Sequence, residues 1–241
     1  MSDSLYGQVI ASYLGLGWLA PPAQLAAHLA AEERHNANSF GFTVVTNRTT
    51  PPPGGQVPDD DTTWQQGGPD WSSVAVWLLQ GGGNSSGSGS ESVGVGGNLT
   101  AALGPARRSL ENWRSRLHDL WDLCGLTSTD SPPAEGARGM PYITSHYGYL
   151  LVDYFLLPAL AGQTTDVARG TLSFAPAVPC PFNLPALLAG LTGTVSCDGE
   201  TSAFTLAVSF GHLVLPAGGL TVNGRAYAGA VDLAGGDSVT W

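Results

Sequence analysis

A change in the spacing of apolar residues near residue 162 constrains this 241-residue chain more than any other feature. Before that point apolar residues recur at intervals of three or four, which predicts helices. From Gly170 onward, short β-like runs are separated by turn residues, which predicts strands. The pair Asn223-Gly224 favours a tight hairpin turn. We therefore expect a mainly α region over residues 1–162, followed by a small antiparallel β domain over residues 163–241.

The individual elements follow from the same periodicities and from their start and stop residues. Helices are expected from residue 3 to the stop at residues 15–17, over residues 21–36, from about 69 to 80, 98–124 and 145–160. A short β-like run is expected over residues 40–46, and strands are expected over residues 171–174, 193–197, 204–210, 220–222 and 239–241. A proline- and aspartate-rich loop over residues 47–63 and a Gly/Ser tract over residues 81–97 interrupt the helical region.

Composition excludes some classes of function. Hydrophobic residues make up 43% of the chain and charged residues 12%, which fits a folded protein. The net charge is -10, and the nine basic residues are all arginines without a basic stripe, so we expect no nucleic-acid partner. Phosphate-loop, dinucleotide-loop, metalloprotease and calcium-loop motifs do not occur, so we expect neither a cofactor nor a metal.

Three cysteines, Cys124, Cys180 and Cys197, form no CxxC pair, and their odd number argues against a zinc site or a disulfide scaffold. A bridge between Cys180 and Cys197 across neighbouring strands stays possible, but unpaired thiols are the preferred interpretation. The N-terminus lacks the pattern of a signal peptide, and no apolar run is long enough to span a membrane, so we expect a soluble chain. The sequons at Asn47, Asn84 and Asn98 are weak evidence for secretion.

Trp71 is the best candidate for a binding residue. Gln66 and Asp70 lie beside it at the start of a predicted helix. An aromatic ring covers the C–H face of a sugar while neighbouring polar groups bind its hydroxyls, although Trp71 could equally pack in the core. His146 heads the last predicted helix, but its neighbour Ser145 points away from it, which excludes a triad.

Glycoside hydrolysis needs two carboxyl groups on either side of the scissile bond. The candidates are Glu32, Glu33, Asp70, Asp130 and Asp153. Because helices commonly carry carboxylates on their surface, we expect each of these to be solvated or to cap a helix.

Several short segments occur in the order in which they occur in one known family. They are Ser2-Asp3 with Gly7-Gln8, Gly15-Leu16-Gly17, Asn36, Val45-Thr46-Asn47, Gln66 with Trp71, and Leu123-Cys124-Gly125-Leu126. Together they resemble the C-terminal half of the catalytic domain of glycoside hydrolase family 116, which includes non-lysosomal glucosylceramidases and bacterial β-glucosidases. Val9 stands where that family has a tryptophan, and the segment from Pro141 to Tyr147 replaces its arginine-containing stretch.

The resemblance implies an incomplete (α/α)6 toroid that contributes one wall of a sugar pocket. It places both catalytic carboxylates upstream of this chain, so no catalytic residue is expected here, and Trp71, Gln66, Asn47, Asp70 and His146 are the expected substrate-binding residues. The expected partners are a carbohydrate or glycolipid substrate, the missing catalytic half, and a membrane surface touched through a glycolipid. The alternative is a non-catalytic carbohydrate-binding or structural module.

Overall fold

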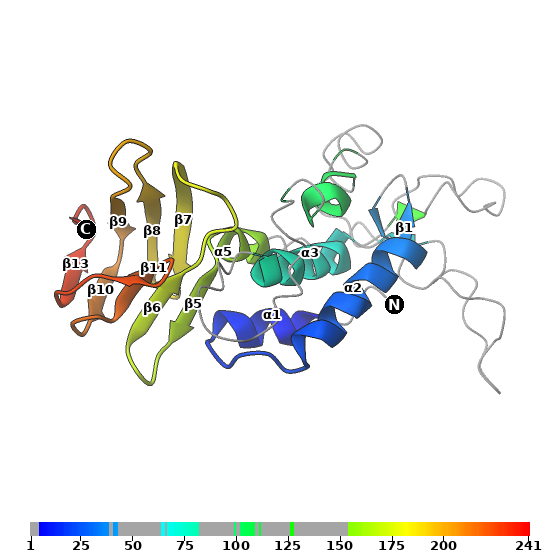
Figure 1. Ribbon diagram of the computed structural model, residues 1–241, viewed down its shortest axis with the longest axis horizontal. Helices are drawn as coiled ribbons and strands as arrows, with labels where there is room; N and C mark the ends of the chain where they lie inside the picture. The colour runs from blue at the N-terminus through cyan, green and yellow to red at the C-terminus, as the bar shows by residue number, and fades with distance from the viewer. Residues whose placement is uncertain are drawn as a thin grey trace. The chain divides into compact units, whose positions relative to one another are not determined.

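The computed structural model describes residues 5–38, 41–42, 64–65, 67–81, 99, 102–108, 111, 126–127 and 154–241. Its contacts divide the chain into two compact units. The first comprises Met1–Gly7, Ala20–Trp77 and Thr100–Tyr154, and the second comprises Gln8–Leu19, Leu78–Leu99 and Phe155–Trp241. Figure 1 shows that most of the described strands belong to the second unit.

The described helices are short. They are α1 (Tyr6–Tyr13), α2 (Pro22–His35), α3 (Gly67–Gly81) and α5 (Leu156–Leu160), and residues 102–108 are also helical. Helix α2 begins with a proline, whose fixed φ suits the first turn, and the backbone N–H of Asn36 caps its end by donating to Glu32 O at 2.7 Å. Leu25 and Leu29 are buried along one face of α2.

Most of the regular secondary structure described in the second unit is strand. The strands are β5 (Gln163–Asp166), β6 (Thr171–Phe174), β7 (Phe182–Leu188), β8 (Leu191–Cys197), β9 (Phe204–Phe210), β10 (His212–Leu215), β11 (Leu220–Val222), β12 (Arg225–Ala226), β13 (Val231–Ala234) and β14 (Ser238–Thr240). Two pairs of two-residue strands lie elsewhere: β1 (Ala37–Asn38) pairs with β2 (Gly41–Phe42), and β3 (Trp64–Gln65) pairs with β4 (Leu126–Thr127).

The strands of the second unit form two four-stranded sheets and a two-stranded ribbon. The sheet orders are β12-β11-β6-β5 and β14-β9-β8-β7, and the ribbon pairs β10 with β13. All described pairings are antiparallel except that of β6 with β11. Between β11 and β12, Asn223 and Gly224 have φ values of 50° and 75°, which confirms the predicted hairpin turn.

A single apolar core joins both sheets and the ribbon. Along β8 and β9 buried and less buried residues alternate, which places every second side chain in this core. The core residues include Leu172 and Leu220 from one sheet, Val195 and Leu206 from the other, and Leu233 from the ribbon. Burial of these apolar side chains is the main contribution to the stability of the unit.

Gln163 links the end of α1 to the edge of the second sheet, within the second unit. Its side chain is almost fully buried and makes two hydrogen bonds with the backbone of Leu187. Gln163 Nε2 donates to Leu187 O at 2.6 Å, and Leu187 N donates to Gln163 Oε1 at 3.0 Å. The Tyr13 hydroxyl donates to the same Leu187 carbonyl. Because buried polar groups are costly when unpaired, this network fixes where the end of α1 meets β7.

The expected mainly α fold with an incomplete (α/α)6 toroid is wrong. The described chain has short helices and mostly antiparallel strands, so it is a mixed fold dominated by β structure. Helical spacing is a local property, whereas a toroid also requires many long helices that pack as successive hairpins. The longest described helix, α3, has 15 residues. The expectation of a glycosidase accompanied that toroid and is unsupported by this architecture.

The preferred interpretation of the cysteines as unpaired thiols is also wrong for two of them. Cys180 and Cys197 form a disulfide, with their Cα atoms 5.5 Å apart. Cys197 ends β8, and Cys180 lies two residues before Phe182, which is the register partner of Cys197 on β7. Cys124 lies outside the described residues. Within the described part of the chain, no helix combines the length and apolar character needed to cross a bilayer.

Candidate functional site

The five predicted sugar-site residues are not brought together by the described structure. Trp71 and Asp70 lie in α3, but their side chains are outside the described set. Gln66, Asn47 and His146 lie outside the described residues altogether. The prediction of a sugar site around Trp71 therefore stays a prediction.

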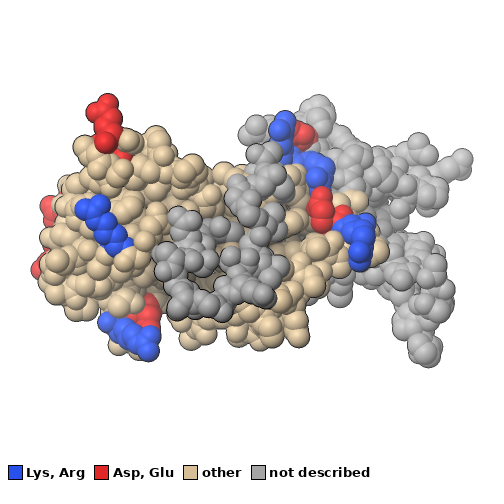
Figure 2. All heavy atoms as spheres, viewed as in Figure 1, with Lys and Arg blue, Asp and Glu red and all other residues tan. Residues whose placement is uncertain are grey.

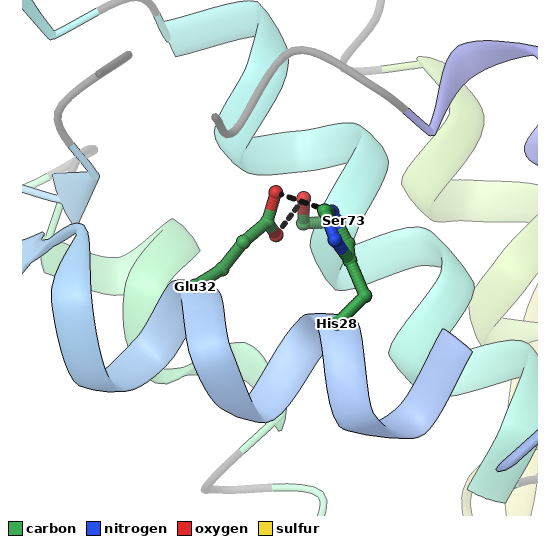
Figure 3. Close-up of polar contacts among 3 residues, drawn as sticks. All are labelled: His28, Glu32 and Ser73. Carbon is green, nitrogen blue, oxygen red and sulfur yellow. Dashed lines mark hydrogen bonds and ion pairs between the residues drawn. The ribbon is translucent and has the colours of Figure 1, made fainter. Parts of the chain in front are cut away.

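A buried polar cluster, which the sequence analysis did not predict, connects α2 and α3 in the first unit (Figure 3). Glu32 is 2% exposed, and the Ser73 hydroxyl donates to its Oε2 at 2.7 Å. His28, one helical turn earlier, lies with its Nε2 3.0 Å from Glu32 Oε1. Both carboxylate oxygens thus have a partner, as the cost of burying a charged group requires.

Burial raises the pKa of Glu32 above its usual value of 4.5, while the hydrogen bond from Ser73 and the charge of His28 act in the opposite direction. A carboxyl with a raised pKa is a common general acid. Here, however, Ser73 is fully buried and Glu32 nearly so, which leaves neither side chain exposed to a substrate. We therefore interpret this cluster as a structural link between the two helices.

The raised pKa of Glu32 should make the free energy of unfolding depend on pH, and Glu32→Gln should remove this dependence. The folded chain binds more protons than the unfolded chain between pH 4.5 and the raised pKa. The contribution of Glu32 to stability is therefore fully present below pH 4.5 and is lost as the pH rises through this window. Urea unfolding at several pH values should show Glu32→Gln gaining stability relative to the parent as the pH rises.

Glu33→Gln is the matched control for this prediction. Glu33 is the next residue along α2, is partly exposed, and accepts from Arg108 Nη2 at 3.4 Å. The pH dependence of this control should follow that of the parent chain. An unchanged pH dependence in Glu32→Gln would contradict the assignment of the window to Glu32.

The second unit carries an aromatic surface that sequence reasoning also missed. It consists of Phe204, Arg225, Tyr227 and Trp241, and we call it the Trp241 edge. The Trp241 ring centroid lies 5.9 Å from those of both Phe204 and Tyr227, in tilted and edge-on arrangements. The guanidinium carbon of Arg225 lies 5.8 Å from the Phe204 ring centroid. Such distances are typical of favourable aromatic and cation–π contacts.

Backbone and side-chain hydrogen bonds fix the indole of Trp241. Its N–H and carbonyl pair with those of Phe204, both at 3.0 Å, and so extend the β9–β14 ladder by one residue. The indole Nε1 donates to the backbone oxygen of Arg225 at 3.3 Å. Phe204 is buried, Trp241 and Tyr227 are partly exposed, and Arg225 is exposed. Trp241 and Tyr227 thus pack partly against the apolar core of the unit, keep part of their surface exposed, and lie beside an exposed guanidinium.

A sequence signal for each cluster existed. Glu32 continues the spacing of Leu25 and Leu29 on α2, which is the buried face of that helix. Trp241 ends the strand predicted over residues 239–241, and Arg225 and Tyr227 follow the Asn223-Gly224 turn. Their meeting at one edge depends on strand order, which the sequence does not reveal.

Comparison with known proteins adds no family to these observations. No protein-family model matches the chain, and no curated protein matches it. The resemblance to glycoside hydrolase family 116 therefore stays a prediction, and the site itself has to carry the functional argument. Among the described residues, no group of histidine, cysteine or carboxylate side chains has the arrangement of a metal site.

Proposed function

We propose that this chain is a non-catalytic carbohydrate-binding module that holds a glycan at the Trp241 edge. The observation that carries the proposal is the pairing of a partly exposed, immobilised indole with a second ring and an exposed guanidinium.

The chemistry of the edge suits a pyranose. A sugar with equatorial hydroxyls presents a C–H face that packs on an aromatic ring and a polar rim that needs hydrogen-bond donors. Trp241 and Tyr227 provide ring surface, and Arg225 provides donors. The guanidinium has five N–H groups, of which one makes a long contact of 3.5 Å to Ser202 O. Donors of Arg225 are therefore available to sugar hydroxyls.

A rigid binding surface favours the binding of ligands that make weak contacts, such as sugars. Ordering a mobile side chain on binding costs roughly 0.5–1.5 kcal/mol. The Trp241 ring is already held by its own indole bond and by the Phe204 and Tyr227 rings, so little of that cost remains. This argument distinguishes Trp241 from Phe210, which is 67% exposed and makes no described ring contact.

The β-rich unit carries few charges among its described residues. Figure 2 shows only scattered blue and red side chains on the visible face of the β-rich unit, with no dense patch of either sign. A surface whose few charges are of both signs fits a neutral oligosaccharide better than a polyanion. We therefore propose that the ligands are neutral, glucose-type oligosaccharides, either free or as the headgroup of a glycolipid.

Trp241→Ala should weaken binding of a soluble β-1,4-linked glucose oligosaccharide by about 30-fold, the effect of removing a central aromatic contact. Isothermal titration calorimetry on the full chain measures this directly. Trp241→Phe keeps a ring at the position and should lose much less. Circular dichroism melting must show each variant folded at the temperature of the titration.

Phe210→Ala is the matched control because it removes an exposed ring from β9, the strand on which Phe204 also lies. It should bind like the parent chain. Equal affinity of the parent, Trp241→Ala and Phe210→Ala would overturn the assignment of the site, and an absence of binding in all of them would overturn the proposed function.

A further inference from the structure

We propose that the Cys180–Cys197 disulfide is a redox switch for the Trp241 edge, so that reduction weakens glycan binding there. This inference rests on the proposed function and adds a regulation to the same site. It follows from where Cys197 lies in the sheet, from which sulfur is exposed, and from how the aromatic rings are supported.

Cys197 lies between two aromatic residues in the sheet. It is the register partner of Phe182 on β7 and of Phe204 on β9. The Phe182 and Phe204 rings stack with centroids 6.4 Å apart, and Phe204 in turn contacts Trp241 and Arg225. A continuous row of side chains therefore leads from the disulfide strand to the proposed sugar surface.

The disulfide also holds the end of an edge strand. Strand β7 is outermost in its sheet, and Phe182 with Cys197 is the last pair of its ladder. The ends of edge strands open more readily than the centres of sheets. The bond from Cys180 to Cys197 prevents this opening, because it ties the chain just before Phe182 to the neighbouring strand. After reduction, the start of β7 can separate and take Phe182 away from Phe204.

The two sulfurs differ in access to solvent. Cys180 is exposed, whereas Cys197 is buried among the core residues. A dithiol reductant therefore attacks the Cys180 sulfur, and Cys197 leaves as a thiolate that takes up a proton. The second thiol of the reductant then attacks the mixed disulfide and releases Cys180 as a thiol. In sum two electrons pass from the dithiol, which becomes a disulfide, to the pair of cysteines.

The test compares the full chain when oxidised, reduced with dithiothreitol, and reoxidised, with free thiols counted by alkylation and mass spectrometry. Affinity for the glucose oligosaccharide should fall by about tenfold on reduction and return on reoxidation. Cys180→Ser with Cys197→Ser should bind like the reduced chain and ignore the reductant. Cys124→Ser, which keeps the disulfide, should respond like the parent.

A second readout separates this inference from the proposed function. The indole N–H resonance of Trp241 should shift on reduction even without a sugar, while the backbone amide resonances stay dispersed as in a folded protein. If reduction instead unfolded the whole unit, the amide resonances would lose their dispersion as well. Unchanged affinity and an unchanged Trp241 resonance in the reduced chain would overturn the switch, as would unfolding of the whole unit. A shifted resonance in a chain that never binds the oligosaccharide would leave the mechanical coupling standing and refute the carbohydrate function.

Discussion

Gly162→Ala should destabilise the β-rich unit by about 3 kcal/mol or more. Gly162 has a φ of +56°, and a Cβ atom there would lie 1.9 Å from the backbone oxygen of Ala175. The two backbones are held together because Ala175 N donates to Gly162 O at 3.0 Å. The new methyl group cannot be accommodated without breaking that bond. Chemical denaturation of the full chain, monitored by circular dichroism, measures the loss.

Gly190→Ala separates the steric clash from the backbone strain. Gly190 has a φ of +75°, but a Cβ atom there would meet nothing within 4 Å. Its cost should be only the strain of a left-handed alanine, about 1 kcal/mol. Equal destabilisation by the two substitutions would show that the close approach of Gly162 to Ala175 contributes nothing.

Leu220→Ala is expected to cost about 2–5 kcal/mol, the usual range for a buried leucine. Leu220 is fully buried on β11, where its register partner on β6 is Leu172. It lies in the core that joins the two sheets and the ribbon, so the cavity would be enclosed on all sides. Thermal and urea unfolding should both report the loss.

Val214→Ala provides the comparison for Leu220→Ala. Val214 alternates on β10 with buried Leu213 and Leu215, and it is 64% exposed. A surface substitution of this kind changes stability by about 0.5 kcal/mol or less. If both alanine variants unfold at the denaturant concentration of the parent chain, the described core is wrong.

Elements with strong local signals could be predicted from the sequence. The spacing of apolar residues after Pro22 predicted α2, which ends at His35 with Asn36 as its cap. The strands β6, β9 and β11 have the predicted bounds. Each carries its own periodicity or turn residues, so its identity does not depend on distant partners.

Strands that depend on long-range pairing were not predicted. Strand β7 contains Pro185, which argues against a central strand but is tolerated in β7 because this strand lies at the edge of its sheet. Strands β10 and β13 pair with each other although β11 and β12 lie between them in the sequence. Neither segment contains a residue pattern that identifies its partner strand. The toroid expectation failed for the same reason, because helical spacing does not specify how elements assemble.

The kinds of residue in the candidate site could be predicted from the sequence, but their positions in the chain could not. The sequence analysis looked for an aromatic ring beside polar groups and found that pattern around Trp71, where the residues are adjacent in sequence. At the Trp241 edge the same pattern arises from β9, β12 and the end of β14, which only the sheet topology brings together. Glu32 was expected to be solvated or to cap a helix. Its burial could not be predicted, because the hydroxyl that pairs with it belongs to Ser73 in another helix.

The most direct test of the central claim is a titration of the ¹⁵N-labelled full chain with the glucose oligosaccharide, following the tryptophan indole resonances. The chain has seven tryptophans, and the Trp241→Phe variant identifies the signal of Trp241. The Trp241 Nε1–H bond to Arg225 O makes this resonance a reporter of the edge itself. We predict a saturable shift of the Trp241 signal at the concentrations that give calorimetric binding. Binding that leaves this signal in place, or no binding at all, would contradict a carbohydrate site at the Trp241 edge.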